Sequence, residues 1–446
     1  MKEYDSHLEQ FKRFEHESAQ DNWLLPLRRS GMDRFSQTGF PGLNDEDWRF
    51  TNVAPISKLP FKPVPATISQ KLGSERLALF PLMGLPANRL VFLDGHFDAS
   101  LSSVSSGDGE IICSLSSAIR DHKALLEPHL ARHVSMESSP FTALNTAFFK
   151  DGAFVHLPKG CVLDVPIHLV YVSTSVEAGS TSHPRNLIIA GAGSQATILE
   201  THTSLHESAY VTNAATEFVL GEGANVEHCK YQDESLAAFH IAALHANLAR
   251  SSNFISHSIA IGARLSRNNI RTVLGGEGVE CVLNGLYLTH RDQLADHHMV
   301  VEHAEPHCNS HEYFNGILDG KSKGVFHGRI LVRQAAQKTD AKQTNKNLLL
   351  SEDATVDTKP QLEIYADDVK CTHGATIGQL NEESIFYLRT RGIGAETARH
   401  MLIHAFAGEI IERVRHPALR EELNRLVWDR LEANPHVATQ QSGPNV

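Results

Sequence analysis

The sequence is short of cysteine, and the cysteines it has are not arranged in pairs. Six are scattered over 446 residues without a C-x-x-C motif, which excludes a zinc ribbon and a thioredoxin-type redox site. No apolar run approaches the roughly 18 residues that span a bilayer, and the first residues show no apolar signal-peptide core. Scattered cysteines without a signal peptide are typical of a reducing compartment. We therefore expect a cytoplasmic protein that does not enter a membrane.

A surplus of positive charge and the common nucleotide-binding motifs are also missing. The formal net charge is −11, whereas nucleic acids and anionic membranes both favour a basic face, so neither is an expected partner. The sequence contains no G-x-x-x-x-G-K-[ST] loop and no G-x-S-x-G elbow. We therefore expect no ATPase site and no hydrolase triad in this chain.

Three regions differ in their residue pattern. Residues 1–150 mix helical periodicity with strand-like segments, residues 151–380 contain short alternating strands, and residues 381–446 return to helical periodicity. In the central region, the turns Gly191-Ala192-Gly193 and Gly221-Glu222-Gly223 are followed by similar strands. Repeated units of a glycine turn and a strand predict a mainly β domain, either a β-solenoid or a β-sandwich.

An apolar stripe marks the helix that follows Gly394. Such a stripe either belongs to the protein's own core or docks a partner, and the pattern leaves both open. Charged residues on its flanks, Arg389, Arg391, Glu409 and Glu412, suit the rim of an interface. The stripe is predicted to contain Ala398, Met401, Leu402, Ala405 and Phe406, followed by Ile410 and Val414.

Histidine and glutamate gather between residues 297 and 311. A metal-dependent enzyme of the cupin-like or solenoid type would place such side chains on strands as ligands, and we keep this as the alternative function. Against it, His297 and His298 are adjacent on a predicted strand and point to opposite faces, so they cannot both bind one ion. The candidates are His297, His298, Glu302, His303, Glu305, His307, Cys308 and His311, with Glu200 and His202 as further members.

Cys371 and His373 form the second candidate site. They are two residues apart on a predicted strand, so their side chains point to the same face. A thiolate with an imidazole suits iron–sulfur chemistry or zinc. Two donors do not complete a cluster site, which takes four ligands, so the others must come from elsewhere, most simply from another subunit. With 27 histidines in the chain, the spacing alone is also compatible with a chance pair.

A long ordered run surrounds this pair. Its segments are Asp-Thr-Lys-Pro-Gln-Leu-Glu-Ile (357–364), Asp-Asp-Val-Lys-Cys (367–371), His-Gly-Ala-Thr (373–376) and Arg-Gly-Ile (391–393), with Glu-Asp-Trp-Arg-Phe-Thr (46–51) near the start. In this order they resemble the SufB/SufD family of iron–sulfur cluster assembly proteins. The resemblance implies a right-handed parallel β-helix core, flanked by N-terminal and C-terminal helical domains.

The resemblance also implies a function and partners. The chain would be a non-catalytic scaffold of a SufBCD-type complex, with His373 and Cys371 completing the cluster-building site at the junction with a SufB-like subunit. An iron–sulfur cluster would be present only transiently and only in the complex, and the isolated chain would hold none. ATP-driven movement of SufC-like subunits would open the junction, and without SufB the chain would pair with its own copy.

Two departures from the SufB pattern favour the SufD pattern. SufB carries a glutamate directly after the corresponding histidine, where this chain has Gly374. No cysteine lies between Cys308 and Cys371, so the sulfur-accepting thiol of SufB is missing. The resemblance further suggests that the C-terminal helices dock the SufC-like ATPase. The residues expected at this contact are Arg389, Arg391, Gly392, Ile393, Phe406 and Glu409.

Overall fold

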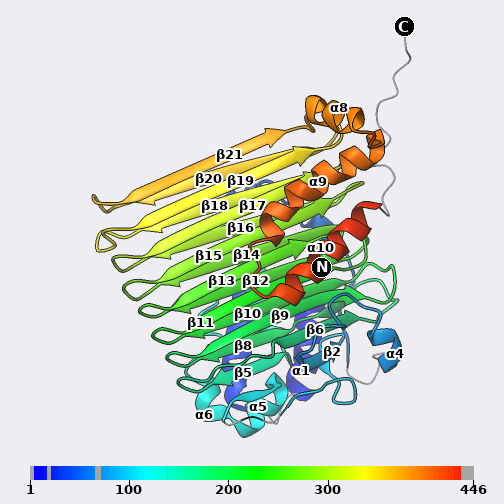
Figure 1. The fold of residues 1–446 in the computed structure, drawn as a ribbon. Coiled ribbons are helices and arrows are strands. Elements are labelled where there is room, and N and C mark those ends of the chain that lie inside the picture. The colour runs from blue at the N-terminus through cyan, green and yellow to red at the C-terminus, as the bar shows by residue number, and fades with distance from the viewer. Residues whose placement is uncertain are drawn as a thin grey trace.

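Two largely parallel β-sheets, stacked face to face, form the centre of the computed structural model (Figure 1). The structure describes residues 5–17, 22–65, 72–105, 107, 109–137 and 139–432. The chain alternates between the sheets, so odd-numbered strands from β9 to β21 lie in one and even-numbered strands from β8 to β20 lie in the other. This is a parallel β-helix, so the predicted fold class is confirmed and the sandwich is excluded.

From β9 onward the strands of the solenoid are 8–10 residues long. We call the sheet that contains β21 sheet B and the sheet that contains β20 sheet A. The strands are β5 (Ala153–Leu157), β6 (Ile167–Ser173), β7 (Ser180–Ser182), β8 (Arg185–Ala190), β9 (Gln195–Ser204), β10 (Val211–Leu220), β11 (Asn225–Asp233), β12 (Phe239–Leu248), β13 (Asn253–Ala260), β14 (Leu265–Leu274), β15 (Glu280–Thr289), β16 (Leu294–His303), β17 (Asn309–Leu318), β18 (Lys323–Val332), β19 (Asp340–Leu349), β20 (Thr355–Ile364) and β21 (Lys370–Gly378).

Glycine turns join the coils, as the sequence predicted. Gly193 and Gly223 have φ of 68° and 66°, a left-handed conformation that a residue without Cβ adopts at no steric cost. At Gly191 a Cβ would lie 2.7 Å from the carbonyl oxygen of Leu157 in the coil below. The turns therefore need glycine both for their backbone angle and for close stacking of neighbouring coils.

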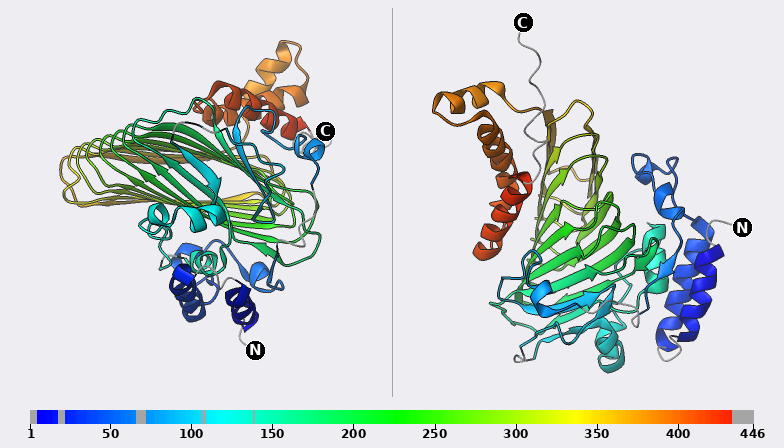
Figure 2. Two further views of the ribbon diagram at one scale, coloured as in Figure 1. Left: turned by 90° about the horizontal axis from the view of Figure 1, so that it is seen from below. Right: turned by 90° about the vertical axis from the view of Figure 1, so that its right-hand side faces the viewer.

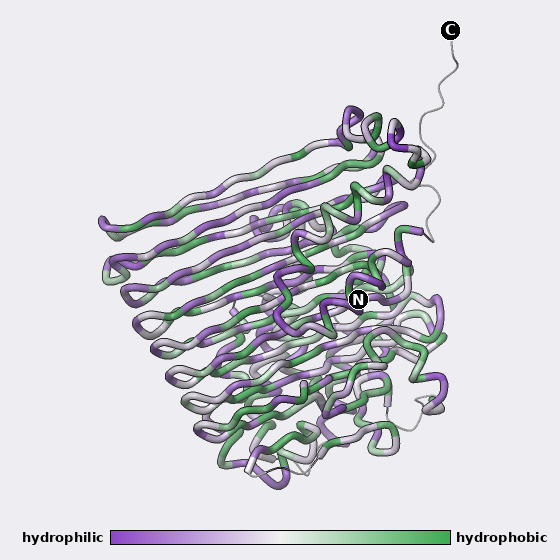
Figure 3. Tube along the Cα trace, viewed as in Figure 1, coloured by the Kyte–Doolittle hydropathy of each residue, from purple (hydrophilic) through white to green (hydrophobic). Residues whose placement is uncertain are grey.

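The space between the sheets is filled by inward-facing side chains. Alternate positions along each strand point inward. Hydrophobic and hydrophilic residues both occur along the strands (Figure 3). The core of this space is a continuous apolar cluster that runs along the solenoid and includes Ile198, Phe218, Phe254, Leu283 and Phe326. Burial of this cluster is the main stabilising term for the coils.

The N-terminal segment caps one end of the solenoid and covers sheet A. Strand β2 extends sheet B through a parallel pair with β6, and β4 extends sheet A through an antiparallel pair with β5. The elements are α1 (Asp5–Glu17), η1 (Asn22–Leu24), α2 (Leu25–Thr38), η2 (Glu46–Trp48), α3 (Ala54–Ser57), β1 (Lys62–Pro63), α4 (Ser74–Leu77), β2 (Asn88–Leu93), β3 (His96–Phe97), β4 (Ile111–Ser114), α5 (Leu115–Asp121), α6 (Lys123–Leu126) and α7 (Pro140–Phe148).

The C-terminal helices pack on the opposite face, against sheet B (Figure 2). They are α8 (Glu382–Thr390), α9 (Ala395–Ile411) and α10 (Pro417–Glu432). Ile403 and Ile411 of α9 join Leu423 of α10 in an apolar cluster with outward-facing residues of sheet B. No helix among the described residues is long and apolar enough to cross a membrane.

The predicted apolar stripe of α9 is right only in part. Ala398 and Ile410 are buried as predicted, and so is Val414 just after the helix, whereas Met401 and Ala405 are exposed and Leu402 and Phe406 are half-buried. The helix also buries Ile403 and Ala407, which the predicted stripe did not include. Helix α9 carries apolar residues on several faces, so periodicity alone did not identify the face that meets the sheet. Some apolar side chains of the predicted stripe, such as Met401, therefore lie on the surface.

Candidate functional site

The last coil of the solenoid is open. Strand β20 pairs with β18, and β21 pairs with β19, and each is the end strand of its sheet among the described residues. In Figure 1 they lie at the end farthest from the N-terminal cap. We call this open end, between β20 and β21, the terminal mouth. Every residue of β21 except Cys371 is exposed, because no further coil covers it.

Cys371 and His373 both point into the terminal mouth. In parallel in-register strands, paired residues project to the same face of the sheet. Cys371 pairs with Ala341, which is fully buried in an apolar cluster against which Cys371 packs. His373 pairs with Gln343, which is also buried. The two predicted residues therefore share one face, as the sequence indicated, and that face continues the solenoid interior.

The two donors differ in their surroundings. Cys371 is half-buried, and burial together with the nearby Asp340 carboxylate raises the pKa of its thiol. It is therefore protonated at neutral pH in this chain, and its use as a ligand requires that the proton be lost. His373 is exposed to solvent. The imidazole is consequently the more accessible of the two donors.

The expected docking residues divide into two groups. Asn381 caps α8 by accepting hydrogen bonds from the backbone N–H groups of Glu383 and Ser384. The helix buries Ile385 and leaves Phe386 and Tyr387 67% and 57% exposed. At its C-terminal end Arg389, Arg391 and Gly392 are exposed and Ile393 is half-buried. The guanidinium of Arg391 lies 4.9 Å from the Tyr387 ring centroid and donates to the Tyr387 hydroxyl at 2.9 Å.

Phe406 and Glu409 lie at an internal contact. The Phe406 carbonyl accepts a hydrogen bond from Asn315 Nδ2 at 2.9 Å, and its ring packs against the cluster shared by α9 and sheet B. Glu409 accepts from Lys346 Nζ at 2.7 Å. These two residues therefore attach α9 to the solenoid, whereas the two most exposed apolar side chains of the C-terminal helices, Phe386 and Tyr387, lie on α8.

The histidine and glutamate residues of the alternative site do not assemble into one site. His297 and His303 are fully buried inside the solenoid, where they hydrogen-bond Ser258 and Ser310. Glu302 accepts hydrogen bonds from two arginines instead of facing a histidine. The remaining members are spread over several positions: Glu305 and His307 are exposed, Cys308 is buried, and His311 is half-buried near Asp340.

Glu200 and His202 belong to a different buried network. The His202 Nε2 lies 2.7 Å from one carboxylate oxygen of Glu200, and His228 Nε2 lies 3.4 Å from the other. Lys230 is buried nearby, and burial lowers its pKa to about 8. His228 and Lys230 lie beside Glu200 because β9 and β11 are paired in this register, and the sequence did not reveal that register. These histidines give the buried Glu200 carboxylate polar partners inside the solenoid. Glu200 and His202 therefore do not join the metal site that the alternative function predicted around residues 297–311.

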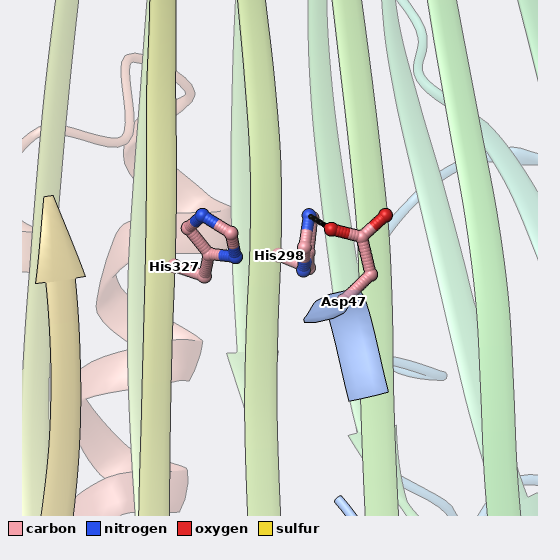
Figure 4. Close-up of side chains that lie close together, drawn as sticks. All are labelled: Asp47, His298 and His327. Atoms are coloured by element: carbon pink, nitrogen blue, oxygen red, sulfur yellow. Dashed lines mark ion pairs between the residues drawn. The ribbon is translucent and has the colours of Figure 1, made fainter. Parts of the chain in front are cut away.

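Among the described residues, one group of three donors comes close together: Asp47, His298 and His327 (Figure 4). The two histidines are paired across adjacent strands of sheet A, and Asp47 reaches them from η2. Sequence reasoning missed His327 and Asp47, although His327 lies one coil after His298. The ring nitrogen His298 Nε2 is 3.6 Å from the Asp47 carboxylate.

Arg267 argues against a metal at these three residues. Its Nη2 lies 3.2 Å from His298 Nδ1, and a guanidinium can only donate, so Nδ1 is an acceptor. Burial, and then Arg267, lower the pKa of His298 to about 2, so the ring is neutral. Its single proton is therefore on Nε2, the atom that faces Asp47, and that atom has no lone pair for an ion. The group is a polar contact between the N-terminal segment and sheet A.

Comparisons with known proteins agree with the geometry. The family profiles "SufBD protein N-terminal region" and "SUF system FeS cluster assembly, SufBD core domain" match residues 1–169 and 171–406. An iron–sulfur cluster assembly SufBD family protein of Synechocystis is 32% identical over 420 residues, which is 92% of this chain and 91% of that protein. The iron–sulfur cluster assembly protein SufD of Escherichia coli is 32% identical over 408 residues, 91% of this chain and 93% of that protein. The chain therefore belongs to the SufB/SufD family of iron–sulfur cluster assembly proteins and is SufD-like.

Proposed function

We propose that this chain is the scaffold subunit of a cytoplasmic SufBCD-type complex and performs no catalysis of its own. It would complete the cluster-building site at a junction with a SufB-like subunit and would dock a SufC-like ATPase. The observation that carries the proposal is the terminal mouth, where β20 and β21 each have one edge without a partner strand among the described residues, and β21 carries Cys371 and His373.

The junction with the SufB-like subunit is proposed at the edges of β20 and β21. Unpaired strands present free N–H and C=O groups, which favour pairing with another chain. Ile377 and Tyr365 are 51% and 62% exposed beside these edges, so apolar surface is also available for burial. A related subunit with the same architecture would fit there, and a second copy of this chain would fit when SufB is absent.

At this junction Cys371 and His373 would supply two donors to the nascent cluster. A cluster site uses four ligands, so the SufB-like subunit would supply the others. The cluster is the cargo of the complex and leaves it, so the isolated chain would hold no stoichiometric iron. His373 would be the main contribution, because its ring is exposed while the thiol of Cys371 is protonated and half-buried.

The SufC-like ATPase is proposed to bind α8 and the start of α9. Phe386, Tyr387 and Met401 offer exposed apolar side chains, and Arg389 and Arg391 lie beside them. Aromatic and arginine side chains are enriched at interface hot spots. ATP-driven movement of the docked ATPase would pull on the C-terminal helices, of which α9 contacts β15 and β17 of sheet B, and would open the junction.

Anaerobic purification tests the proposal. The isolated chain and its complex with SufB-like and SufC-like partners are compared for iron, sulfide and the visible absorption of a cluster. We expect a cluster in the complex and none in the isolated chain. A stoichiometric, tightly bound metal in the isolated chain would instead identify a metalloprotein and overturn the scaffold assignment.

A further inference from the structure

A buried column of side chains leads to His373. Glu312 of β17 pairs with Gln343 of β19, and Gln343 pairs with His373 of β21. One coil below, Leu283 of β15 pairs with Glu312 and belongs to the interior apolar cluster, which fixes this register as inward-facing. Glu312, Gln343 and His373 therefore follow one another along the interior of sheet B and end at the terminal mouth.

Glu312 and Gln343 form a buried polar pair, and the adjacent inward positions on their strands, Ser310 and Asn345, are also polar. They are 0% and 2% exposed, and Gln343 Nε2 donates to Glu312 Oε2 at 2.6 Å. Burial raises the pKa of Glu312 to about 7. A buried carboxyl has a cost in free energy that an apolar pair would avoid. The pair therefore calls for a role beyond packing.

The opposite sheet leaves space for this pair. Gly328 of β18 faces it, and a Cβ at this position would lie 2.0 Å from Gln343 Nε2 and 3.1 Å from Glu312 Oε2. The Gln343 amide therefore occupies the space that a side chain at position 328 would fill. Gly328 is in register with Pro360 of β20, the end strand of sheet A at the terminal mouth.

The side-chain oxygen of Gln343 accepts no hydrogen bond among the described residues. The amide Nε2 is used by Glu312, and this Oε1 is buried. Adjacent strands are about 4.8 Å apart, so a side chain in register on β19 can reach the ring on β21. A histidine that binds a metal almost always donates its other ring N–H to an oxygen acceptor, which fixes its tautomer.

We propose that Glu312 and Gln343 are positioning residues for His373. Glu312 holds the Gln343 amide so that its carbonyl oxygen accepts the ring N–H of His373 once a partner closes the terminal mouth. The other ring nitrogen then keeps its lone pair and faces the cluster. This inference rests on the proposed role of His373, and it adds two buried residues that never touch the cluster.

The tautomer of His373 tests the inference without reference to activity. The complex is prepared with ¹⁵N-histidine in this chain, and the His373 ring signals are identified as those lost in His373→Gln. We expect a single tautomer in the wild type and in Gln343→Glu, which keeps an acceptor, and a mixture in Gln343→Leu and Glu312→Leu. Ser256→Ala, in the same inward column but four coils from His373, serves as the control for general destabilisation and should match the wild type.

Cluster assembly provides the second readout. Loss of an outer hydrogen-bond partner of a metal ligand typically weakens binding or activity 10–100-fold, so Gln343→Leu should slow assembly by about that factor. An unchanged His373 tautomer in both leucine variants would overturn the positioning role, whatever the assembly rate. Normal assembly with His373→Gln would instead overturn the proposed function, while a tautomer change in Gln343→Leu would still support the positioning of the ring.

Discussion

Replacement of Phe386 by alanine should separate ATPase docking from folding. The side chain is 67% exposed on α8, so its loss leaves no cavity. A phenylalanine buries roughly 200 Å² when it is fully covered, so about 130 Å² remains for a partner to cover. At about 25 cal/mol per Å² this area contributes about 3 kcal/mol to binding, or about 100-fold in Kd. The free energy of unfolding should change by less than about 0.5 kcal/mol.

Calorimetric titration of the variant with the SufC-like ATPase measures this effect. The matched control is Leu79→Ala, which removes an apolar side chain that is 83% exposed in the N-terminal segment, outside α8 and α9. The control should bind like the wild type. If Phe386→Ala binds within about threefold of the control, the docking surface does not include α8, and the interface must lie on the solenoid or the N-terminal segment.

Three further predictions concern the free edge of β21, the buried histidines of the solenoid, and Cys371 as a ligand. In light scattering, we expect the isolated wild type to form the proposed homodimer and Ile377→Asp to be a monomer, and a persistent dimer in the variant would place the contact elsewhere. Burial lowers the pKa of His168 and His297 to about 3, so the unfolded chain alone binds these protons below about pH 6.5. Each should cost about 2 kcal/mol of unfolding free energy between pH 7 and pH 5 in urea titrations, and pH-independent stability would contradict this. Cys371→Ser should reduce cluster assembly less than His373→Ala, and a larger loss would reverse their ranking.

The structure also changes how the docking should be tested. Removal of everything after Arg391 would separate α9 and α10 from sheet B. Ile259, Leu286 and Ile317 lie in the cluster that these helices cover, so truncation would expose a broad apolar surface and promote aggregation. A single substitution on α8 avoids this problem, because α8 makes few buried contacts of its own.

Much of the fold could be predicted from local sequence. Gly193 and Gly223 mark turns because few other residues adopt their backbone angle, and the strands between such turns alternate as a half-buried strand must. The shared face of Cys371 and His373 followed from their spacing of two. These features depend on neighbours along the chain, which is why the sequence is sufficient for them.

Contacts between coils could not be predicted in this way. The pairing of Gln343 with His373 depends on the number of residues in each turn, and a change of one residue would move the partner to the other face. The position of Asp47 beside His298 has the same origin, because it joins segments far apart in the chain. Helix α9 has apolar residues on several faces, and the face that it buries is the one that contacts the apolar residues of sheet B. The periodicity of the helix alone could not identify that face.

The most direct test of the central claim is cluster assembly in a reconstituted complex that carries His373→Ala. Its ring is exposed on the last strand, so the variant should fold and bind both partners normally. Thr372→Ala, the neighbouring position on the outer face of β21, is the matched control. We expect the His373 variant to lose nearly all of the cluster absorption while the control keeps it. Full cluster formation in an intact complex with His373→Ala would show that the terminal mouth does not build the cluster.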